Sequence, residues 1–169
     1  KLICYSKNLI NLPSGINHKL SIIKPLIRKE YYETDMFQKQ DNLFTIIIIG
    51  GSQGAKIFDK LLNKSFVSIA KQVSIKIIHQ TSEKNINFLK NFYSQNNIEN
   101  KVFSFDHNLN EVLKQGDLCI TRAGASSLAE LSFLNIPFVA IPLPSSKDNH
   151  QYENAKYYKE QDCCWIIDQ

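Results

Sequence analysis

The stretch "DLCITRAGASSLAELSFLNIPFVAIPLP", residues 117–144, carries the clearest structural pattern in the chain. It begins with a short apolar run, breaks at Arg122 to Gly124, and continues as an apolar helix before a second apolar run at 137–143. Short apolar runs joined by a single helix are typical of parallel strands that are buried on both faces. The stretch therefore predicts a strand–helix–strand unit with the right-handed crossover of α/β proteins.

The same alternation extends over most of the chain. Further strands are expected at 43–50, 74–80 and 101–105, and helices at 55–70, 83–95, 108–115, 125–135 and 148–160. Because single helices separate the strands, the sequence predicts an α/β fold with a doubly wound, Rossmann-like parallel sheet.

The chain divides into two parts by composition. Residues 1–42 contain short apolar pieces, Pro13, Gly15, Pro25 and a polar end, which indicates the tail of a preceding domain and an interdomain linker. Residues 43–169 form the Rossmann-like domain. The chain starts without methionine, and its last residues, "CCWIIDQ", stop just as a strand has formed. We therefore expect a piece of a longer protein, with the second domain clipped at its C-terminal end.

Composition and charge limit the classes of function. The chain is 43% hydrophobic and 21% charged, as in ordinary soluble proteins, and no apolar run approaches the about 20 residues of a membrane span. A net charge of +4 without long basic blocks favours a solvated surface over a nucleic-acid site. A basic face against anionic lipid stays open.

Cysteine and histidine spacing argues against a metal site. The four cysteines lack a C-x-x-C spacing, which indicates reduced thiols in a cytoplasmic protein. His18, His79 and His107 form no ligand spacing with them.

The first candidate loop is "GGSQGA", directly after the strand at 43–50. In doubly wound sheets, ligands bind where the carboxyl ends of strands turn into helices. Gly50, Gly51 and Gly54 would let backbone N–H groups approach a phosphate closely, and Ser52 offers a hydroxyl. A tight turn without a ligand is the alternative interpretation.

The second candidate loop, "TRAGASSLAE", contains a glutamate on an apolar helix. Gly124 permits the turn, while Ala125, Ser126 and Ser127 would offer first-turn N–H groups and hydroxyls to a second anionic oxygen. Two neighbouring anion sites suggest a diphosphate. Glu130 could then accept hydrogen bonds from the vicinal hydroxyls of a ribose. A solvent-facing glutamate, favoured by the helix dipole, explains the spacing equally well.

The third candidate loop, "PLPSSKDNHQYENA", is polar and precedes a helix. Its side chains suit sugar hydroxyls, although polarity is also ordinary for a loop; they are Asp148, Asn149, His150, Gln151 and Asn154. His150 has no evident partner for a role as general base.

Arginine is rare in a chain that uses 18 lysines. The two arginines are Arg28 and Arg122. Where lysine is the usual cation, an arginine can mark a place that needs the planar fork for a phosphate.

Four segments in this order, "IIIIGGSQGAK", "HQT", "DLCITRAGASSLAELSFLNIPFVAIPLP" and "DNHQYENA", resemble one enzyme family. It is the bacterial peptidoglycan N-acetylglucosaminyltransferase family that converts lipid I to lipid II. The match runs from about residue 23 to the end. The resemblance implies the C-terminal half of a GT-B glycosyltransferase, which binds UDP-GlcNAc, needs no metal or other cofactor, and lies peripherally on the cytoplasmic face of the bacterial inner membrane.

The resemblance also assigns roles to residues around the donor's nucleotide. Ser52 would bind the diphosphate together with the backbone of Ala125 to Ser127. Glu130 would bind the ribose hydroxyls. Asp106 occupies the uracil-binding loop, where the main chain pairs with the base and the family usually has an apolar side chain.

Two more assignments concern the sugar and the linker. Gln151, with His150 before it, falls where the family contacts the GlcNAc hydroxyls. Arg28 matches an arginine after the interdomain segment, although the glycine-asparagine-proline that precedes it in the family is altered to Lys24-Pro25-Leu26-Ile27.

Catalysis would need a second half. In this family the N-terminal domain binds lipid I and supplies the proposed catalytic base, so we expect residues 1–169 alone to be inactive in transfer. Two alternatives stay open: a stand-alone UDP-GlcNAc-binding subunit that works with a separate membrane partner, and another UDP-sugar enzyme such as a 2-epimerase.

Overall fold

A six-stranded, fully parallel sheet forms the centre of the computed structural model, which describes residues 1–5, 15–32, 42–50 and 56–169. The strand order is β5-β4-β3-β6-β7-β8. The strands are β3 (Phe44–Ile49), β4 (Ile75–Gln80), β5 (Glu99–Phe103), β6 (Leu118–Thr121), β7 (Phe138–Ala140) and β8 (Cys164–Ile166). The order reverses between β3 and β6, so the predicted doubly wound sheet is confirmed, and its ligand-binding edge is expected at this point.

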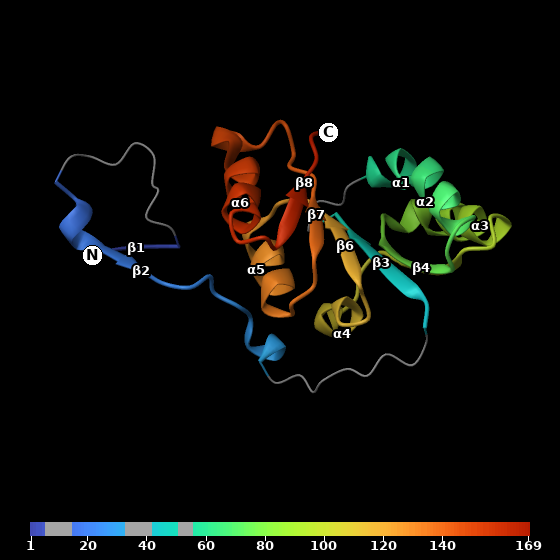
Figure 1. The fold of residues 1–169 in the computed structure, drawn as a ribbon, viewed down its shortest axis with the longest axis horizontal. Helices are drawn as coiled ribbons and strands as arrows, with labels where there is room; N and C mark the ends of the chain where they lie inside the picture. Colours follow the sequence, from blue (N-terminus) through green and yellow to red (C-terminus); the bar gives the residue numbers. More distant parts are fainter. Residues whose placement is uncertain (6–14, 33–41, 51–55) are drawn as a thin grey trace.

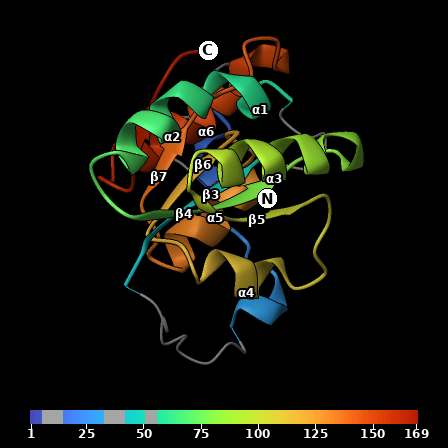
Figure 2. The ribbon, with the colours of Figure 1, turned by 90° about the vertical axis from the view of Figure 1, so that its right-hand side faces the viewer.

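Helices cover both faces of the sheet (Figure 1). The helices on one face are α1 (Phe58–Leu61), α2 (Asn63–Ala70) and α3 (Ile86–Gln95), which face the viewer in Figure 2. Those on the other face are α4 (Leu109–Leu113), α5 (Ala125–Phe133) and α6 (His150–Lys159).

The isoleucine run of β3 contributes side chains to two separate hydrophobic cores. Ile46 and Ile48 are buried in the cluster with the α1–α3 side chains, whereas Ile47 and Ile49 are buried in the cluster with the α4–α6 side chains. Successive side chains of a strand point to opposite faces, so four consecutive apolar residues require a cover on each side. This requirement explains why the run predicts a central strand.

The helix expected at 55–70 is instead two helices, separated at Leu62. Asp59 in α1 accepts hydrogen bonds from Thr81 and Asn85, which follow β4. Phe66 in α2 is buried against the sheet. Phe58 in α1 is buried in the same cluster, so both short helices pack on this face of the sheet.

The N-terminal residues form a small unit of their own. β1 (Leu2–Cys4) and β2 (Leu20–Ile22) pair in parallel, apart from the six-stranded sheet (Figure 1). The following segment returns to the main domain through the short 3₁₀ helix η2 (Lys29–Tyr31). Tyr31 is only 2% exposed and belongs to the core cluster beneath α5. The predicted linker therefore contributes a side chain to the core of the domain that follows it.

A methyl group at Gly116 should strain this core. A Cβ there would lie 2.6 Å from Cδ1 and 2.8 Å from Cγ1 of Ile47, which is fully buried. We expect Gly116→Ala to lower the free energy of unfolding by about 1–2 kcal/mol, as measured by urea denaturation. A variant as stable as the wild type would show that Ile47 can move aside without loss.

Candidate functional site

β3 and β6 are parallel neighbours at the point where the strand order reverses, so their carboxyl ends lie side by side. Gly50 follows β3 and is buried. Three predicted ligand residues, Gly51, Ser52 and Gly54, lie outside the described residues. The loop after β6 is described in full, and it leads directly into α5.

The start of α5 presents open backbone to the surface. Gly124 is its N-cap residue with φ −70° and ψ 135°, a conformation that any residue can adopt. Among the described residues, a Cβ at Gly124 would find only Ser127 Oγ within 4 Å, at 3.8 Å. The turn therefore does not require glycine, contrary to our expectation. Ala125 and Ser126 beside it are exposed and Ser127 is half-buried, so the first turn of α5 is accessible from outside.

The first turns of α6 are tied to the loops around α5. Asn154 donates its side-chain N–H to the carbonyl of Ala123, at 3.0 Å. The Gln151 side-chain oxygen accepts the backbone N–H of Leu143 at 2.9 Å. His150 is exposed, and its Nδ1 lies 2.7 Å from the Lys147 carbonyl oxygen. These contacts hold α6 beside the start of α5. Gln151 and His150, the predicted sugar ligands, contact the backbone of the loop between β7 and α6.

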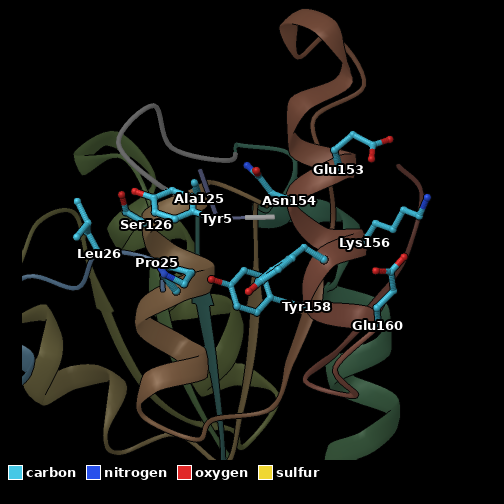
Figure 3. Close-up of a pocket in the computed structure, with 12 residues that line it drawn as sticks. Tyr5, Pro25, Leu26, Ala125, Ser126, Glu153, Asn154, Lys156, Tyr158 and Glu160 are labelled. Atoms are coloured by element: carbon cyan, nitrogen blue, oxygen red, sulfur yellow. The ribbon is translucent and has the colours of Figure 1, made fainter. Parts of the chain in front are cut away.

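A cavity of about 290 Å³ opens between α5 and α6 (Figure 3). The side chains around it come from both helices and from the segment before η2. They include Ala125, Ser126, Asn154, Tyr158, Pro25 and Leu26. The first turn of α5 therefore adjoins a space large enough for a small ligand.

The carboxylate of Glu130 is buried on the next turns of α5, and both of its oxygens accept hydrogen bonds. Only 5% of its side chain is exposed. Oε1 accepts Nε–H of Arg28 at 2.7 Å, and Oε2 accepts Nη2–H of Arg28 at 3.1 Å and the hydroxyl of Tyr31 at 2.9 Å. The interpretation of Glu130 as a solvent-facing residue is therefore wrong. Arg28 and Glu130, both predicted as ligand residues, contact each other.

This cluster shifts the pKa values of its members. The hydrogen bond to Glu130 raises the pKa of Arg28 above its already high usual value. Burial, followed by the nearby Glu130 charge, raises the pKa of Tyr31. At neutral pH the cluster holds a cation and a neutral phenol that both donate to one carboxylate.

Arg122 also binds groups of the protein itself. Its Nη1 donates to the carbonyls of Ile141 and Pro142 at 3.0 and 3.2 Å, and its Nη2 donates to the Gln169 side chain at 2.5 Å. Its guanidinium carbon lies 5.0 Å from the centre of the Phe58 ring. In this structure the fork that suggested a phosphate contact instead joins the loops after β6 and β7.

Asp106 lies in the loop between β5 and α4. Its carboxylate accepts the backbone N–H of Asn108 at 3.0 Å and lies 3.3 Å from Lys101 Nζ. The Asn108 hydrogen bond holds the pKa of Asp106 below its usual value. In α4, Asn110 donates to the Glu30 carbonyl at 3.4 Å. The predicted base loop therefore leads to a helix that touches the segment carrying Arg28.

A buried polar network that was not predicted from the sequence lies on the α1–α3 face of the sheet. His79 is fully buried, with Nδ1 2.7 Å from the Tyr93 hydroxyl and Nε2 3.4 Å from Asp59 Oδ1. Burial pushes the pKa of Asp59 upward, but the adjacent His79 ring and the hydrogen bonds from Asn85 and Thr81 outweigh burial and hold that pKa below its usual value. The motif "HQT" was the only sequence signal, and it does not reveal the partners, which come from α1 and α3.

The described residues contain no group of three histidine, cysteine, aspartate or glutamate side chains that could hold a metal ion. Among the helices of those same residues, none is both long and apolar enough to cross a membrane. All four cysteines are free of disulfides.

Comparisons with known proteins agree on one family. Residues 45–169 match the glycosyltransferase family 28 C-terminal domain. The chain is 42% identical over its whole length to the UDP-N-acetylglucosamine--N-acetylmuramyl-(pentapeptide) pyrophosphoryl-undecaprenol N-acetylglucosamine transferase of Pelagibacter ubique. It is 37% identical over its whole length to the transferase of the same name from Rickettsia bellii.

A solved structure supports the same relationship. The crystal structure of Acinetobacter baumannii MurG matches 95% of this chain and 45% of its own chain, with a TM-score of 0.72 and 25% identity. The chain spans about half the length of the curated relatives it matches, with 48% and 49% of the two transferases covered. The resemblance stated from the sequence motifs is thereby confirmed. From its sequence and its fold, the chain belongs to glycosyltransferase family 28 and carries the C-terminal domain of that family.

Proposed function

We propose that this chain is the donor-binding half of an inverting transferase that moves GlcNAc from UDP-GlcNAc to lipid I and so forms lipid II. The observation that carries the proposal is the open first turn of α5 beside the cavity. The N-terminus of a nine-residue helix attracts anions through its free N–H groups and its dipole. A diphosphate on this turn would place an attached sugar toward α6.

The absence of a side chain at Gly124 supports close approach of a ligand. Its backbone angles do not require glycine, and the nearest described atom leaves room for a Cβ. A ligand backed onto the N–H groups of Ala125 and Ser126 gives a physical reason for glycine at this position. The loop "GGSQGA" after β3 would then supply Ser52 to the same diphosphate.

The acceptor and the catalytic base are assigned to a preceding half. Two parallel strands alone, such as β1 and β2, leave both edges unpaired, whereas parallel sheets normally have more strands and covered faces. We assign this pair to the sheet of an N-terminal domain that binds lipid I and activates its sugar hydroxyl. The family 28 half would stabilise the departing UDP. Because the relatives' named acceptor is an undecaprenol lipid, we place the protein peripherally on the cytoplasmic face of the membrane.

Calorimetric titration of the chain tests this proposal. UDP and UDP-GlcNAc should bind in buffer with EDTA, because no metal is proposed, whereas ADP and GDP-mannose should not. The chain alone should show no transfer to lipid I, and transfer should appear when the N-terminal half of a relative is added. A folded chain that bound neither uridine nucleotide would contradict the proposal.

Replacing Gly124 with alanine should affect the ligand and not the fold. Within the described part of the chain, the added methyl group meets only an ordinary van der Waals contact, so stability to urea should stay within about 0.5 kcal/mol of the wild type. It would stand where the diphosphate approaches, and UDP affinity should fall about tenfold or more. Equal UDP affinity in the variant and the wild type would show that no ligand approaches this backbone. Gly116→Ala is the matched control: the same substitution away from the proposed ligand site should lower the free energy of unfolding and leave UDP affinity unchanged.

A further inference from the structure

The carboxylate of Glu130 has too few free acceptor positions for a second pair of donors. A carboxylate offers about four lone-pair positions, two on each oxygen. Arg28 occupies one position on each oxygen, and the Tyr31 hydroxyl occupies the second position on Oε2. One position on Oε1 is left. Two ribose hydroxyls therefore cannot bind Glu130 while Arg28 and Tyr31 both stay in place.

Arg28 and Tyr31 differ in how easily they could leave. The Arg28 side chain is 52% exposed and covers a glutamate whose side chain is only 5% exposed. Its other terminal nitrogen, Nη1, lies 3.2 Å from Glu30, which is itself 52% exposed. Tyr31 is 2% exposed and packs in the main core. Arg28 is thus the movable donor, whereas Tyr31 is fixed.

We propose that Arg28 is an exchangeable cover over Glu130. A ribose diol displaces Arg28 from the carboxylate, and the released guanidinium then pairs with the diphosphate of the same ligand. The inference rests on the proposed function, because it takes the ligand to be a uridine nucleotide. Tyr31 keeps its hydrogen bond during the exchange and holds the Oε2 side of the carboxylate. Binding of the ribose and engagement of the phosphate are coupled through one arginine.

Charge supports this exchange. Two hydroxyls are weaker partners for a carboxylate than a guanidinium fork, so a neutral nucleoside would displace Arg28 at a loss. A diphosphate offers the released guanidinium new anionic oxygens, to which bidentate bonds are again possible. Arg28 should therefore oppose the binding of uridine and assist the binding of UDP.

Side-chain NMR of arginine tests the exchange directly in the unaltered chain. The sequence contains only Arg28 and Arg122, so the ¹⁵N-labelled protein should give two Nε–H signals, which Arg122→Lys assigns. Saturating uridine should shift or broaden the Arg28 signal and leave the Arg122 signal in place. Bound uridine with an unchanged Arg28 signal would overturn the exchange while leaving the proposed function intact. If neither uridine nor UDP bound, the proposed function would fail, and this inference with it.

A variant gives a second test with effects of opposite sign. Arg28→Leu keeps the aliphatic packing and removes the competing donor, so uridine should bind about three- to tenfold tighter while UDP binds about tenfold weaker. Glu30→Gln is the matched control, because it removes an exposed partner of the same arginine and should leave uridine affinity unchanged. Parallel losses for uridine and UDP, in an Arg28→Leu protein with wild-type circular dichroism, would overturn the proposal.

Discussion

Replacing Asp59 with alanine should lower the free energy of unfolding by about 3–5 kcal/mol, as measured by urea denaturation followed by circular dichroism. Only 4% of its side chain is exposed, and its carboxylate accepts from Thr81 and Asn85 with His79 Nε2 3.4 Å away. Alanine leaves these buried groups without an acceptor, and each unsatisfied group adds to the loss.

Asp106→Ala is the matched control. Asp106 follows β5, the neighbour of β4, and its partners are a lysine and a backbone N–H. Its side chain is 25% exposed, however, so in the variant water can replace it as the hydrogen-bond partner of both groups. Its loss should stay below about 1 kcal/mol. If the two variants were equally stable, the network around Asp59 would not contribute to the fold.

The ionised Asp59 carboxylate should also make the free energy of unfolding depend on pH. The folded-state pKa of Asp59 is lowered, so its ionised form contributes stability above the unfolded pKa of about 3.9. That contribution is lost as the pH falls through the folded-state pKa. Between about pH 4 and pH 2 the wild type should therefore lose stability more steeply than Asp59→Asn, which cannot titrate. Parallel curves would show that the pKa of Asp59 is the same in the folded and the unfolded protein.

The strand and helix order could be predicted because its signals are local. The run of Ile46 to Ile49 requires cover on both faces, and the helices between strands show their own periodicity. The break at Leu62 was not predicted, and neither were the Asp59 contacts with residues 22 and 26 positions away, because the local pattern carries no sign of them. Tertiary anchoring overrides a helical pattern without leaving a sign in the pattern itself.

The site was predictable as a set of residues and not as a set of contacts. Glu130 was singled out by its place on an apolar helix, and Arg28 by the rarity of arginine and by resemblance. Their hydrogen bonds connect residues 102 positions apart, so spacing could not pair them. For Gly124 the sequence instead suggested a structural requirement that the structure does not show. A glycine in a strand-to-helix turn suggests that the backbone requires glycine, but the angles of Gly124 are open to any residue, and the described residues around it leave room for a Cβ.

Glu130→Ala should reduce both stability and donor binding. Because Arg28 is half exposed, its ion pair contributes no more than about 1 kcal/mol, and loss of the hydrogen bond from the Tyr31 hydroxyl adds about 1–2 kcal/mol. We therefore expect a loss of about 1–3 kcal/mol in urea denaturation. UDP affinity, measured by calorimetry, should fall by about 1–3 kcal/mol, or roughly 5- to 150-fold, because the diol loses its acceptor.

Glu153→Ala separates this role from a general effect of charge near the cavity. Glu153 is exposed on α6 and lines the cavity, which Glu130 does not, and we expect Glu153→Ala to change neither stability nor UDP affinity appreciably. Glu130→Gln adds a second comparison, because glutamine keeps the size but turns one acceptor into an N–H₂ group facing the N–H donors of Arg28. Both Glu130 variants should therefore lose UDP affinity. Wild-type affinity in both would limit Glu130 to holding Arg28 and Tyr31 in place, and the ribose would have to bind elsewhere.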